Sequence, residues 1–344
     1  MASALQMLRT ISSVAVATIV WLCRQKPIFK RKKEVWFEDL YFAESPRWHK
    51  GALYFSDFGS DEVIVADFQT RQRRTVVKVP DAEDNCRGPS GLGWMPDGTL
   101  LVSEQRKRRL LAFAAGEEGA GPTRAVELAD MTAGFCNDIV VDSKGGAYVG
   151  NNGFDLSKVE GKPPWEWGET IQATSLVRVD EAGRAATATP PELAFPNGAV
   201  ITPDGQTLLV AETFGGRISA YKRAPDGSLS ERSTWASIPW SFPDGMCLDA
   251  SGALWIALAA VGVFVRMAEG GKLLEVIKAT EGFKATACVL GGPDGKTLFM
   301  LETRETKEEA VKANGPGNSR IVAAQVDVPG ASAPDNPEYF AGYC

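Results

Sequence analysis

Histidine is nearly absent from this chain. The 344 residues contain one copy, His49. A serine or cysteine nucleophile activated by histidine would have to use that residue, and a zinc site built from two or three histidines is excluded. His49 stands beside Lys50 and Gly51 in an expected hairpin turn. We interpret it as an ordinary surface residue.

Paired cysteines are missing as well. No two of the six cysteines form a CxxC pair, and a chain of this size does not depend on disulfides for its stability. We expect small buried thiols, with one bridge left possible. The cysteines are Cys23, Cys86, Cys136, Cys247, Cys288 and Cys344.

The chain has no excess of positive charge. It carries 37 Lys and Arg against 43 Asp and Glu, for a net charge of −6 and a pI near 5.2. A nucleic-acid partner would require a basic surface, so this balance argues against one. The hydrophobic fraction of 44% is that of an ordinary globular protein rather than of a disordered chain.

Acidic residues are absent before Glu34, and the apolar run from Ile11 to Cys23 has 13 residues. That run is shorter than the roughly 20 residues that span a bilayer. It fits a secretory signal, a short membrane anchor or an organelle transit peptide, and any membrane contact would be made through residues 11–23. The basic residues Arg24, Lys26 and 30–33 would keep the remainder cytoplasmic if the run inserts. Without such targeting, the protein would be cytoplasmic.

One short phrase occurs six times in the chain: a polar turn with a glycine, followed by an apolar strand. The glycines are spaced 47, 47, 60, 47 and 43 residues apart. A period of roughly 40–50 residues made of strands indicates the blades of a β-propeller. We predict an all-β, six-bladed propeller at 35–344 after an N-terminal targeting or anchor extension at 1–34. The turn glycines are Gly51, Gly98, Gly145, Gly205, Gly252 and Gly295.

The strands that follow these turns are nearly continuous apolar runs, such as 53–55 and 254–256. Such runs fit strands that are covered on both faces, and the turns suit hairpins with positive φ. The one long interval places about 13 extra residues in 151–174. This insertion is either a loop over the channel mouth, walled by Trp165 and Trp167, or a surface loop whose tryptophans pack onto their own blade.

Counting back eight residues from each turn glycine, or seven from Gly51, reaches one phase of the repeat. Equivalent positions of the blades form a ring around the propeller axis. Three of them stand in a Pro-X-Gly frame, whose glycine we expect to let the backbone turn sharply and aim the side chain inward. The ring positions are Glu44, Ser90, Asn137, Asn197, Asp244 and Ala287.

Four of the six ring positions carry oxygen ligands. Glu44 and Asp244 supply two negative charges, and Asn137 and Asn197 supply amide oxygens. This donor set suits a hard divalent cation. Without a cation, the two carboxylates would repel each other and shift each other's pKa. The alternative is that these polar residues only cap the inner strands and hold channel water.

The motifs around these positions are similar to those of the senescence marker protein / gluconolactonase / luciferin-regenerating enzyme-like family. They are 43–48 (AESPRW), 136–138 (CND), 196–198 (PNG), 243–249 (PDGMCLD) and 287–292 (ACVLGG). The resemblance covers roughly 36–343. It implies a six-bladed propeller with one divalent cation, usually Ca²⁺, with Mg²⁺, Mn²⁺ or Zn²⁺ as alternatives. The implied metal ligands are Glu44, Asn137, Asn197 and Asp244.

The chain departs from that family at one position. Sugar-lactonase members carry an arginine two residues before the ligand Asn, where this chain has Phe135. The departure favours a substrate less polar than an aldonolactone, and some of these aromatic side chains could instead fill gaps between blades. The expected substrate-binding residues are Phe135, Ser90, Trp165, Trp167, Trp240 and Phe242.

The resemblance implies hydrolysis of a lactone to its hydroxy acid. A cation would polarise the carbonyl, Asp244 would act as general base on the attacking water, and Asp138 would orient a ligand or that water. One alternative keeps the metal and hydrolyses an aryl ester or an organophosphate. Another is a propeller that binds calcium or a partner without catalysis.

Overall fold

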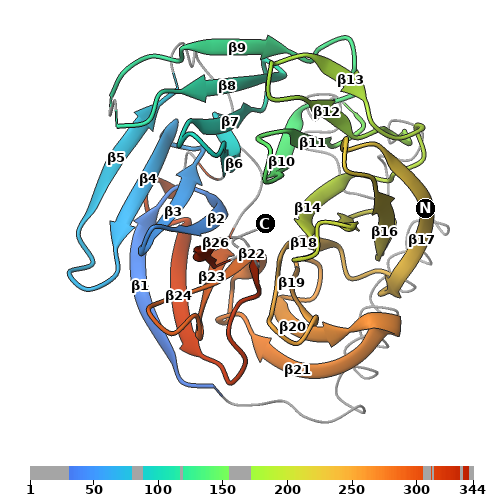
Figure 1. The fold of residues 1–344 in the computed structure, drawn as a ribbon. Coiled ribbons are helices and arrows are strands. Elements are labelled where there is room, and N and C mark those ends of the chain that lie inside the picture. The colour runs from blue at the N-terminus through green and yellow to red at the C-terminus, as the bar shows by residue number, and fades with distance from the viewer. Residues whose placement is uncertain are drawn as a thin grey trace, which may run out of the picture.

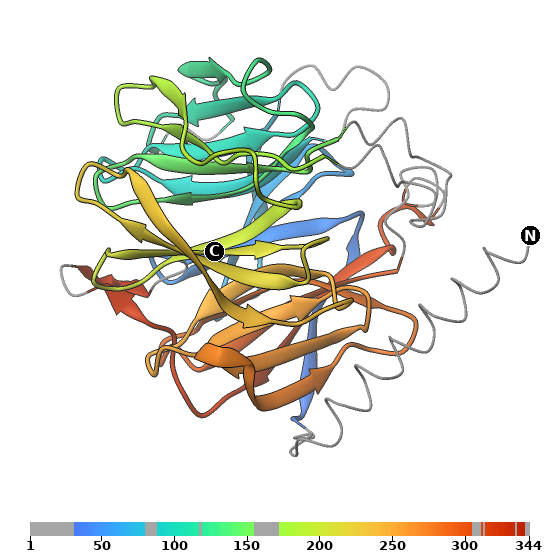
Figure 2. The ribbon, with the colours of Figure 1, turned by 90° about the vertical axis from the view of Figure 1, so that its right-hand side faces the viewer.

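Six four-stranded antiparallel sheets surround a central axis in this computed structural model (Figure 1). The structure describes residues 31–79, 88–116, 119–154, 172–304, 311, 314–333 and 336–340. The predicted all-β, six-bladed propeller is therefore confirmed. Figure 2, turned by 90°, shows the strands of the nearest blades running between the two faces of the ring.

The first five blades each use four consecutive strands, from the axis outward. Blade 1 contains β2 (Ala43–His49), β3 (Ala52–Asp57), β4 (Glu62–Asp67) and β5 (Arg73–Lys78). Blade 2 contains β6 (Pro89–Trp94), β7 (Leu100–Glu104), β8 (Arg109–Phe113) and β9 (Arg124–Glu127). Blade 3 contains β10 (Cys136–Val141), β11 (Ala147–Asn151), β12 (Val177–Val179) and β13 (Ala185–Thr187).

The next two blades follow the same order. Blade 4 contains β14 (Pro196–Ile201), β15 (Thr207–Glu212), β16 (Arg217–Arg223) and β17 (Leu229–Ser237). Blade 5 contains β18 (Pro243–Leu248), β19 (Leu254–Leu258), β20 (Val263–Ala268) and β21 (Lys272–Lys278), and a short 3₁₀ turn, η4 (Glu269–Gly271), precedes β21.

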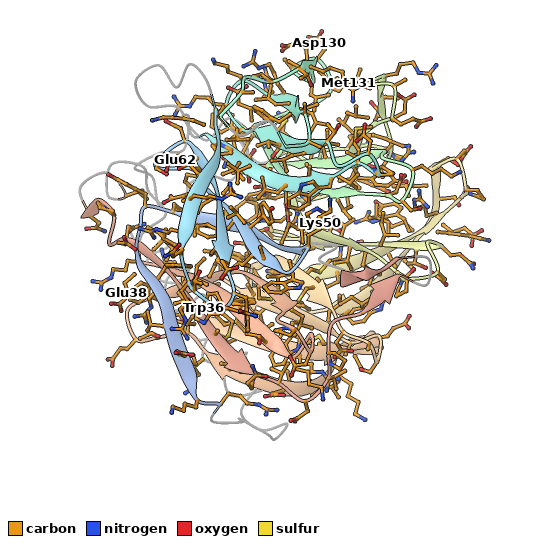
Figure 3. All side chains as sticks on the ribbon, turned by 60° about the vertical axis from the view of Figure 1, so that its left-hand side comes forward. Trp36, Glu38, Lys50, Glu62, Asp130 and Met131 are labelled. Carbon is orange, nitrogen blue, oxygen red and sulfur yellow. The ribbon has the colours of Figure 1, made fainter. Side chains whose placement is uncertain are left out.

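Blade 6 is closed by the N-terminal strand. Its inner strands are β22 (Lys284–Gly291), β23 (Thr297–Thr303) and β24 (Ser319–Gln325), and β1 (Lys33–Leu40) pairs with β24 at the outer edge. Figure 3 labels Trp36 and Glu38 on this strand. The sequence did not predict this closure. Because β1 begins at Lys33, a propeller fragment should begin ahead of the expected boundary at residue 35.

The apolar run at 11–23 lies outside the described residues. Within the part of the chain that the structure describes, no helix is long and apolar enough to cross a membrane.

The hairpins that gave the repeat period have the predicted backbone. All six turn glycines have positive φ, between 68° for Gly295 and 91° for Gly145. The strands after them are covered on both faces, as expected: every residue of β19 and β23 is buried. The interior is therefore a set of apolar layers between blades. Three cysteines are buried within it, namely Cys136, Cys247 and Cys288.

The glycine turns lie at one end of the innermost strands, and the ring positions lie at the opposite end. At the turn end, the ring of His49 stacks on that of Trp94 with centroids 4.0 Å apart, so this histidine is half-buried rather than an ordinary surface residue. Gly330 bridges Asp249 there, ahead of a C-terminal hairpin formed by β25 (Ser332–Ala333) and β26 (Asn336–Phe340). Figure 2 shows this red hairpin at one face of the ring.

Candidate functional site

Each innermost strand is irregular at the predicted ring position. The register shifts between Glu44 and Arg47 in β2, and equivalent shifts interrupt the other five inner strands. Such bulges re-aim a side chain and are common beside active sites. The ring position found by counting residues in the sequence therefore coincides with an irregularity in the strand pairing of every blade. The other shifts lie at 89–92, 136–139, 196–199, 243–246 and 285–287.

The glycines that follow three ring positions have a different role from the one expected. None of Gly91, Gly198 and Gly245 has positive φ. Instead, a Cβ on Gly198 would lie 2.6 Å from the carbonyl oxygen of Asp244, and one on Gly245 would lie 2.5 Å from Cβ of Ala287. These glycines let neighbouring inner strands approach closely, and the expectation of a sharp turn was wrong.

Glu44 and Asp244 lie close enough to affect each other's protonation. Burial, then the charges of Asp244 and Asp138, raise the pKa of Glu44 well above its usual range. Burial and the charge of Asp138 raise the pKa of Asp244 to about 8, although a hydrogen bond from Asn197 acts in the opposite direction. This is the repulsion expected of two carboxylates that converge without a cation.

The amide of Asn197 is oriented by a threonine on the next strand. The hydroxyl of Thr213 donates to the carbonyl of Pro243 at 2.9 Å, so it accepts a hydrogen bond from Nδ2 of Asn197, which lies 3.2 Å away. Nδ2 therefore faces Thr213, and Oδ1 of Asn197 is directed away from it. An oxygen ligand held in this way would be preorganised for a cation.

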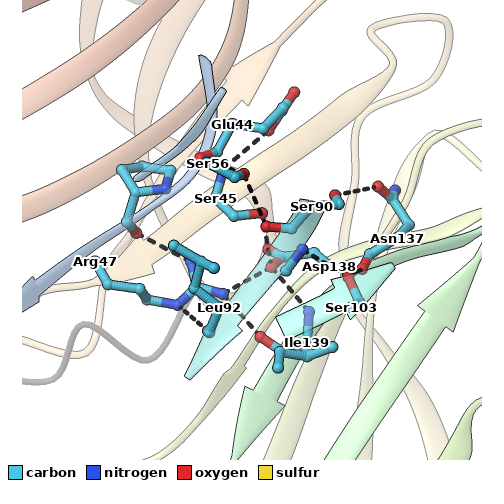
Figure 4. A network of polar contacts seen from close by, with 12 residues as sticks. Glu44, Ser45, Arg47, Ser56, Ser90, Leu92, Ser103, Asn137, Asp138 and Ile139 are labelled. Atoms are coloured by element: carbon cyan, nitrogen blue, oxygen red, sulfur yellow. Dashed lines mark hydrogen bonds and ion pairs between the residues drawn. The ribbon is translucent and has the colours of Figure 1, made fainter. Parts of the chain in front are cut away.

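Serines tie the ring positions of blades 1, 2 and 3 together (Figure 4). Ser56 donates to the carbonyl of Ser90 at 2.8 Å, and Ser90 in turn donates to Oδ1 of Asn137 at 3.3 Å. Ser103 donates to the backbone carbonyl of Asn137 at 2.5 Å. The predicted substrate-binding residue Ser90 is thus 1% exposed, and its hydroxyl contacts another ring residue.

Asp138 is held by a buried arginine. Its Oδ1 accepts hydrogen bonds from Nη2 of Arg47 at 2.7 Å, from the hydroxyl of Ser45 at 3.2 Å and from the backbone N–H of Ile139 at 2.8 Å. Arg47 is only 2% exposed and also donates to the carbonyl of Leu92. The pair of Arg47 and Asp138 therefore links blades 1, 2 and 3 to one another beside the ring position Asn137.

The residues present fit a divalent cation by their chemistry. Neither Glu44 nor Asp244 forms an ion pair with Lys or Arg in the described part of the chain, although both are half-buried. Among the described residues, no group of three or more His, Cys, Asp or Glu could hold a metal ion. A metal here would therefore depend on the amide oxygens of Asn137 and Asn197 as well as on the two carboxylates.

The aromatic residues that were predicted to bind substrate are only partly brought together. Phe135 is buried, and the guanidinium of Arg106 lies 5.6 Å from its ring centroid. Trp240 is 56% exposed, in a turn with φ of 63°. Trp165 and Trp167 lie outside the described residues. Phe242 is half-buried, and its ring contacts Phe214 at 5.4 Å.

Three phenylalanines in this region were not predicted. Phe214 also contacts Phe154 and Phe195, at 5.9 and 5.4 Å between centroids. The sequence did contain a signal for one of them, Phe195, because a phenylalanine stands two residues before each expected metal ligand. These are Phe42 before Glu44, Phe135 before Asn137, Phe195 before Asn197 and Phe242 before Asp244.

Two of these phenylalanines have a strained backbone. Phe195 has φ of 60° and Phe242 has φ of 53°, a region that bulky residues avoid. Each such conformation costs about 1–3 kcal/mol and persists only where the surroundings enforce it. Strain of this kind clusters at functional sites, and here it occurs directly before Pro196-Asn197 and Pro243-Asp244.

Comparison with known proteins gives a family match and similar folds. A family model described as "SMP-30/Gluconolactonase/LRE-like region" matches residues 42–304. A pentonolactonase of Haloferax volcanii is 26% identical over 264 residues, which cover 75% of this chain and 80% of the relative. A 6-deoxy-6-sulfogluconolactonase of Pseudomonas putida is 28% identical over 170 residues, or 48% of this chain. A regucalcin of Xenopus laevis is 30% identical over 129 residues, or 36% of this chain.

The alignments to the Pseudomonas and Xenopus proteins span 56% and 43% of their lengths, so this chain matches about half of each. Among solved structures, a calcium-binding protein named regucalcin from Agrobacterium tumefaciens superposes with a TM-score of 0.70 at 19% identity. The match covers 90% of this chain and 98% of that one. At that identity, the likeness supports the fold alone.

Proposed function

Because the chain belongs to the SMP-30/gluconolactonase/LRE-like family, we propose that it is a divalent-metal-dependent hydrolase that opens a lactone to its hydroxy acid. The observation that carries the proposal is the pair Glu44 and Asp244, two converging carboxylates with no ion-pair partner among the described residues. The names of two relatives, a pentonolactonase and a sulfogluconolactonase, support the choice of a lactone.

The proposed metal ligands are Glu44, Asn137, Asn197 and Asp244. An all-oxygen set with two charges favours Ca²⁺, with Mg²⁺, Mn²⁺ or Zn²⁺ as alternatives. A bound cation would supply Lewis-acid polarisation of the lactone carbonyl. The chain's part in metal binding is to hold the donors in place, and the contact from Thr213 to Asn197 serves this purpose.

Asp244 is the proposed general base. Its carboxylate would accept a proton from the attacking water as the water oxygen bonds to the carbonyl carbon. The ring C–O bond then breaks, and Asp244 returns that proton to the departing ring oxygen, which gives the hydroxy acid. Asp138 acts through position, because Arg47 and Ser45 already bond to its Oδ1. Its fixed negative charge lies near both Glu44 and Asp244 and would favour a cation between them.

The test is hydrolysis by the full-length protein over a lactone panel and a phosphotriester panel, with Ca²⁺, Mg²⁺, Mn²⁺ or Zn²⁺ added and then removed by a chelator. We expect chelator-sensitive lactone hydrolysis that returns when metal is restored. Hydrolysis of phosphotriesters or aryl esters without hydrolysis of lactones would overturn the lactone as the substrate class and favour those esters instead. Calcium binding by calorimetry with no ester hydrolysis would favour a non-catalytic propeller.

A further inference from the structure

Four phenylalanine side chains form a continuous aromatic group across blades 3, 4 and 5. Phe154 contacts Phe195 and Phe214 at centroid distances of 6.1 and 5.9 Å, and Phe214 contacts Phe195 and Phe242 at 5.4 Å each. Phe214 is thus the central member. We call these four residues the phenylalanine wall.

The wall lies at the ring end of the inner strands. Phe195 and Phe242 stand two residues before Asn197 and Asp244. Phe214 follows Thr213, whose hydroxyl orients the Asn197 amide, and the N–H of Phe214 donates to the carbonyl of Ala194 at 3.2 Å. The aromatic surface therefore begins within a few residues of half of the proposed ligand set.

The wall is not a simple gap filler in the core. Phe195, Phe214 and Phe242 are each only half-buried, whereas the core strands beside them are fully buried. Two of the three also have the left-handed backbone described above, which bulky residues adopt only when surroundings enforce it. Half-exposed aromatic rings held under strain beside a reaction centre are suited to contact a ligand.

We propose that the phenylalanine wall binds an apolar alkyl or aryl substituent on the substrate, so that the enzyme selects lactones with such a substituent over sugar lactones. The inference rests on the proposed lactone hydrolysis. Phenylalanine offers no hydrogen bond to a sugar hydroxyl, so a polyhydroxylated substituent would lose its water contacts there without replacement. An alkyl chain gains from the same desolvation.

Three lactones with the same six-membered ring test this selection. δ-Decalactone carries a pentyl substituent, δ-valerolactone carries none, and glucono-δ-lactone carries hydroxyl groups. We expect kcat/KM to be highest for δ-decalactone, at least about tenfold above that for δ-valerolactone, because each buried methylene contributes about fourfold. Equal values for the three lactones, or a preference for gluconolactone, would overturn the inference.

Phe214→Ala should remove most of this preference. Its kcat/KM should fall about tenfold or more for δ-decalactone and change less than about threefold for δ-valerolactone. Phe214→Leu, which keeps an apolar side chain, should give an intermediate loss and guards against a folding defect in the alanine variant. Phe68→Ala is the matched control. Phe68 is a half-buried phenylalanine against Trp36 and Phe299, away from the ring.

Product binding separates this inference from the proposed reaction. Calorimetry with 5-hydroxydecanoate and 5-hydroxyvalerate needs no turnover. Tighter binding of the longer acid that is lost in Phe214→Ala would support binding of the substituent by the phenylalanine wall. If no lactone were hydrolysed in the same experiments, only the proposed function would be overturned. If kcat/KM does not depend on the substituent and both acids bind equally, the inference about the phenylalanine wall is overturned, whereas the proposed lactone hydrolysis stands.

Discussion

The innermost strands and the second strands of the blades both carry a polar residue at a repeated position. On the innermost strands it is the ring that contains Glu44 and Asp244. On the second strands of five blades it is the last residue, or in β23 the residue before the last, and it pairs with the start of the innermost strand. The members of this second set are Asp57, Glu104, Asn151, Glu212 and Glu302.

The three glutamates of the second set, Glu104, Glu212 and Glu302, are paired with arginine or lysine. Glu212 is 0% exposed and accepts from Nε of Arg217 at 2.7 Å and from Nη2 of Arg232 at 2.6 Å. Glu302 is also 0% exposed and bonds to Arg320 at 2.9 Å and to Lys33 of the closing strand at 3.0 Å. These carboxylates stabilise each blade internally.

Repetition at one phase therefore does not by itself identify a binding site. Both sets repeat, and both are rich in Asp, Glu and Asn, although Glu44 and Asp244 are half-buried where Glu212 and Glu302 are fully buried. The difference lies in the partners: arginines and a lysine neutralise Glu212 and Glu302, whereas the charge of Asp244 raises the pKa of Glu44 and neither of these two has a Lys or Arg partner among the described residues. A buried charge without a partner is costly, so it points to a ligand.

The largest effect should come from Asp244→Asn. We expect kcat to fall by about 10³-fold, since a positioned general base contributes about 10²–10⁴-fold. The metal-free variant should be at least as stable as the wild type, because the change removes one of two repelling buried carboxylates. Steady-state kinetics and thermal unfolding after chelation measure the two effects.

Near-full activity in Asp244→Asn would remove the general-base role. A clear loss of metal-free stability would place Asp244 with the structural carboxylates of the second strands.

The mirror variant is Glu212→Gln. Removing one partner of a buried ion pair costs about 3–5 kcal/mol, so the midpoint of urea unfolding should fall strongly. The side chain of Glu212 accepts hydrogen bonds from Arg217, Ser219, Arg232 and the N–H of Ala194, none of which is a proposed metal ligand, so kcat/KM of the folded variant should stay within about twofold of wild type.

Loss of activity in a folded Glu212→Gln protein would contradict the division between the two sets. Arg184→Gln serves as a control for charge removal alone, because that exposed arginine pairs only with Asp180 at a surface turn in the described structure.

The repeat made the propeller and the ring phase predictable from the sequence. Six glycine turns with one spacing are a local signal, and the positive φ values confirm how it arises. The closure by β1 carried no such signal. Lys33 pairs with Ala324, and nothing near Lys33 in the sequence indicates a partner so distant.

The partners of the carboxylates were not predictable either. The acids of the second strands receive their arginines from other strands of the blade, and the contact from Arg47 to Asp138 crosses two blades. Phe242 was predicted to bind substrate, but the other three residues of the phenylalanine wall were missed because the counting considered polar residues only. Counting to the position two residues before each ring residue reaches Phe195 and Phe242. Phe154 and Phe214 join them only through the packing of adjacent blades.

The smallest effect expected is the pH dependence of the second set. Burial alone would raise the pKa of Glu212, but hydrogen bonds from Arg217, Ser219, Ala194 and Arg232 outweigh it and lower the pKa below the ordinary value. A carboxyl whose pKa is depressed by folding stabilises the protein fully above its unfolded-state pKa, and this contribution is lost as the pH falls through the folded-state pKa.

The difference in the free energy of unfolding between wild type and Glu212→Gln should therefore be constant near neutral pH and become smaller below about pH 4.5. Urea unfolding of both proteins between about pH 7 and about pH 3.5 measures it. A difference that stays constant across that range would mean that the arginines do not hold Glu212 in its charged form, and the contrast with Asp244 would then rest on geometry alone.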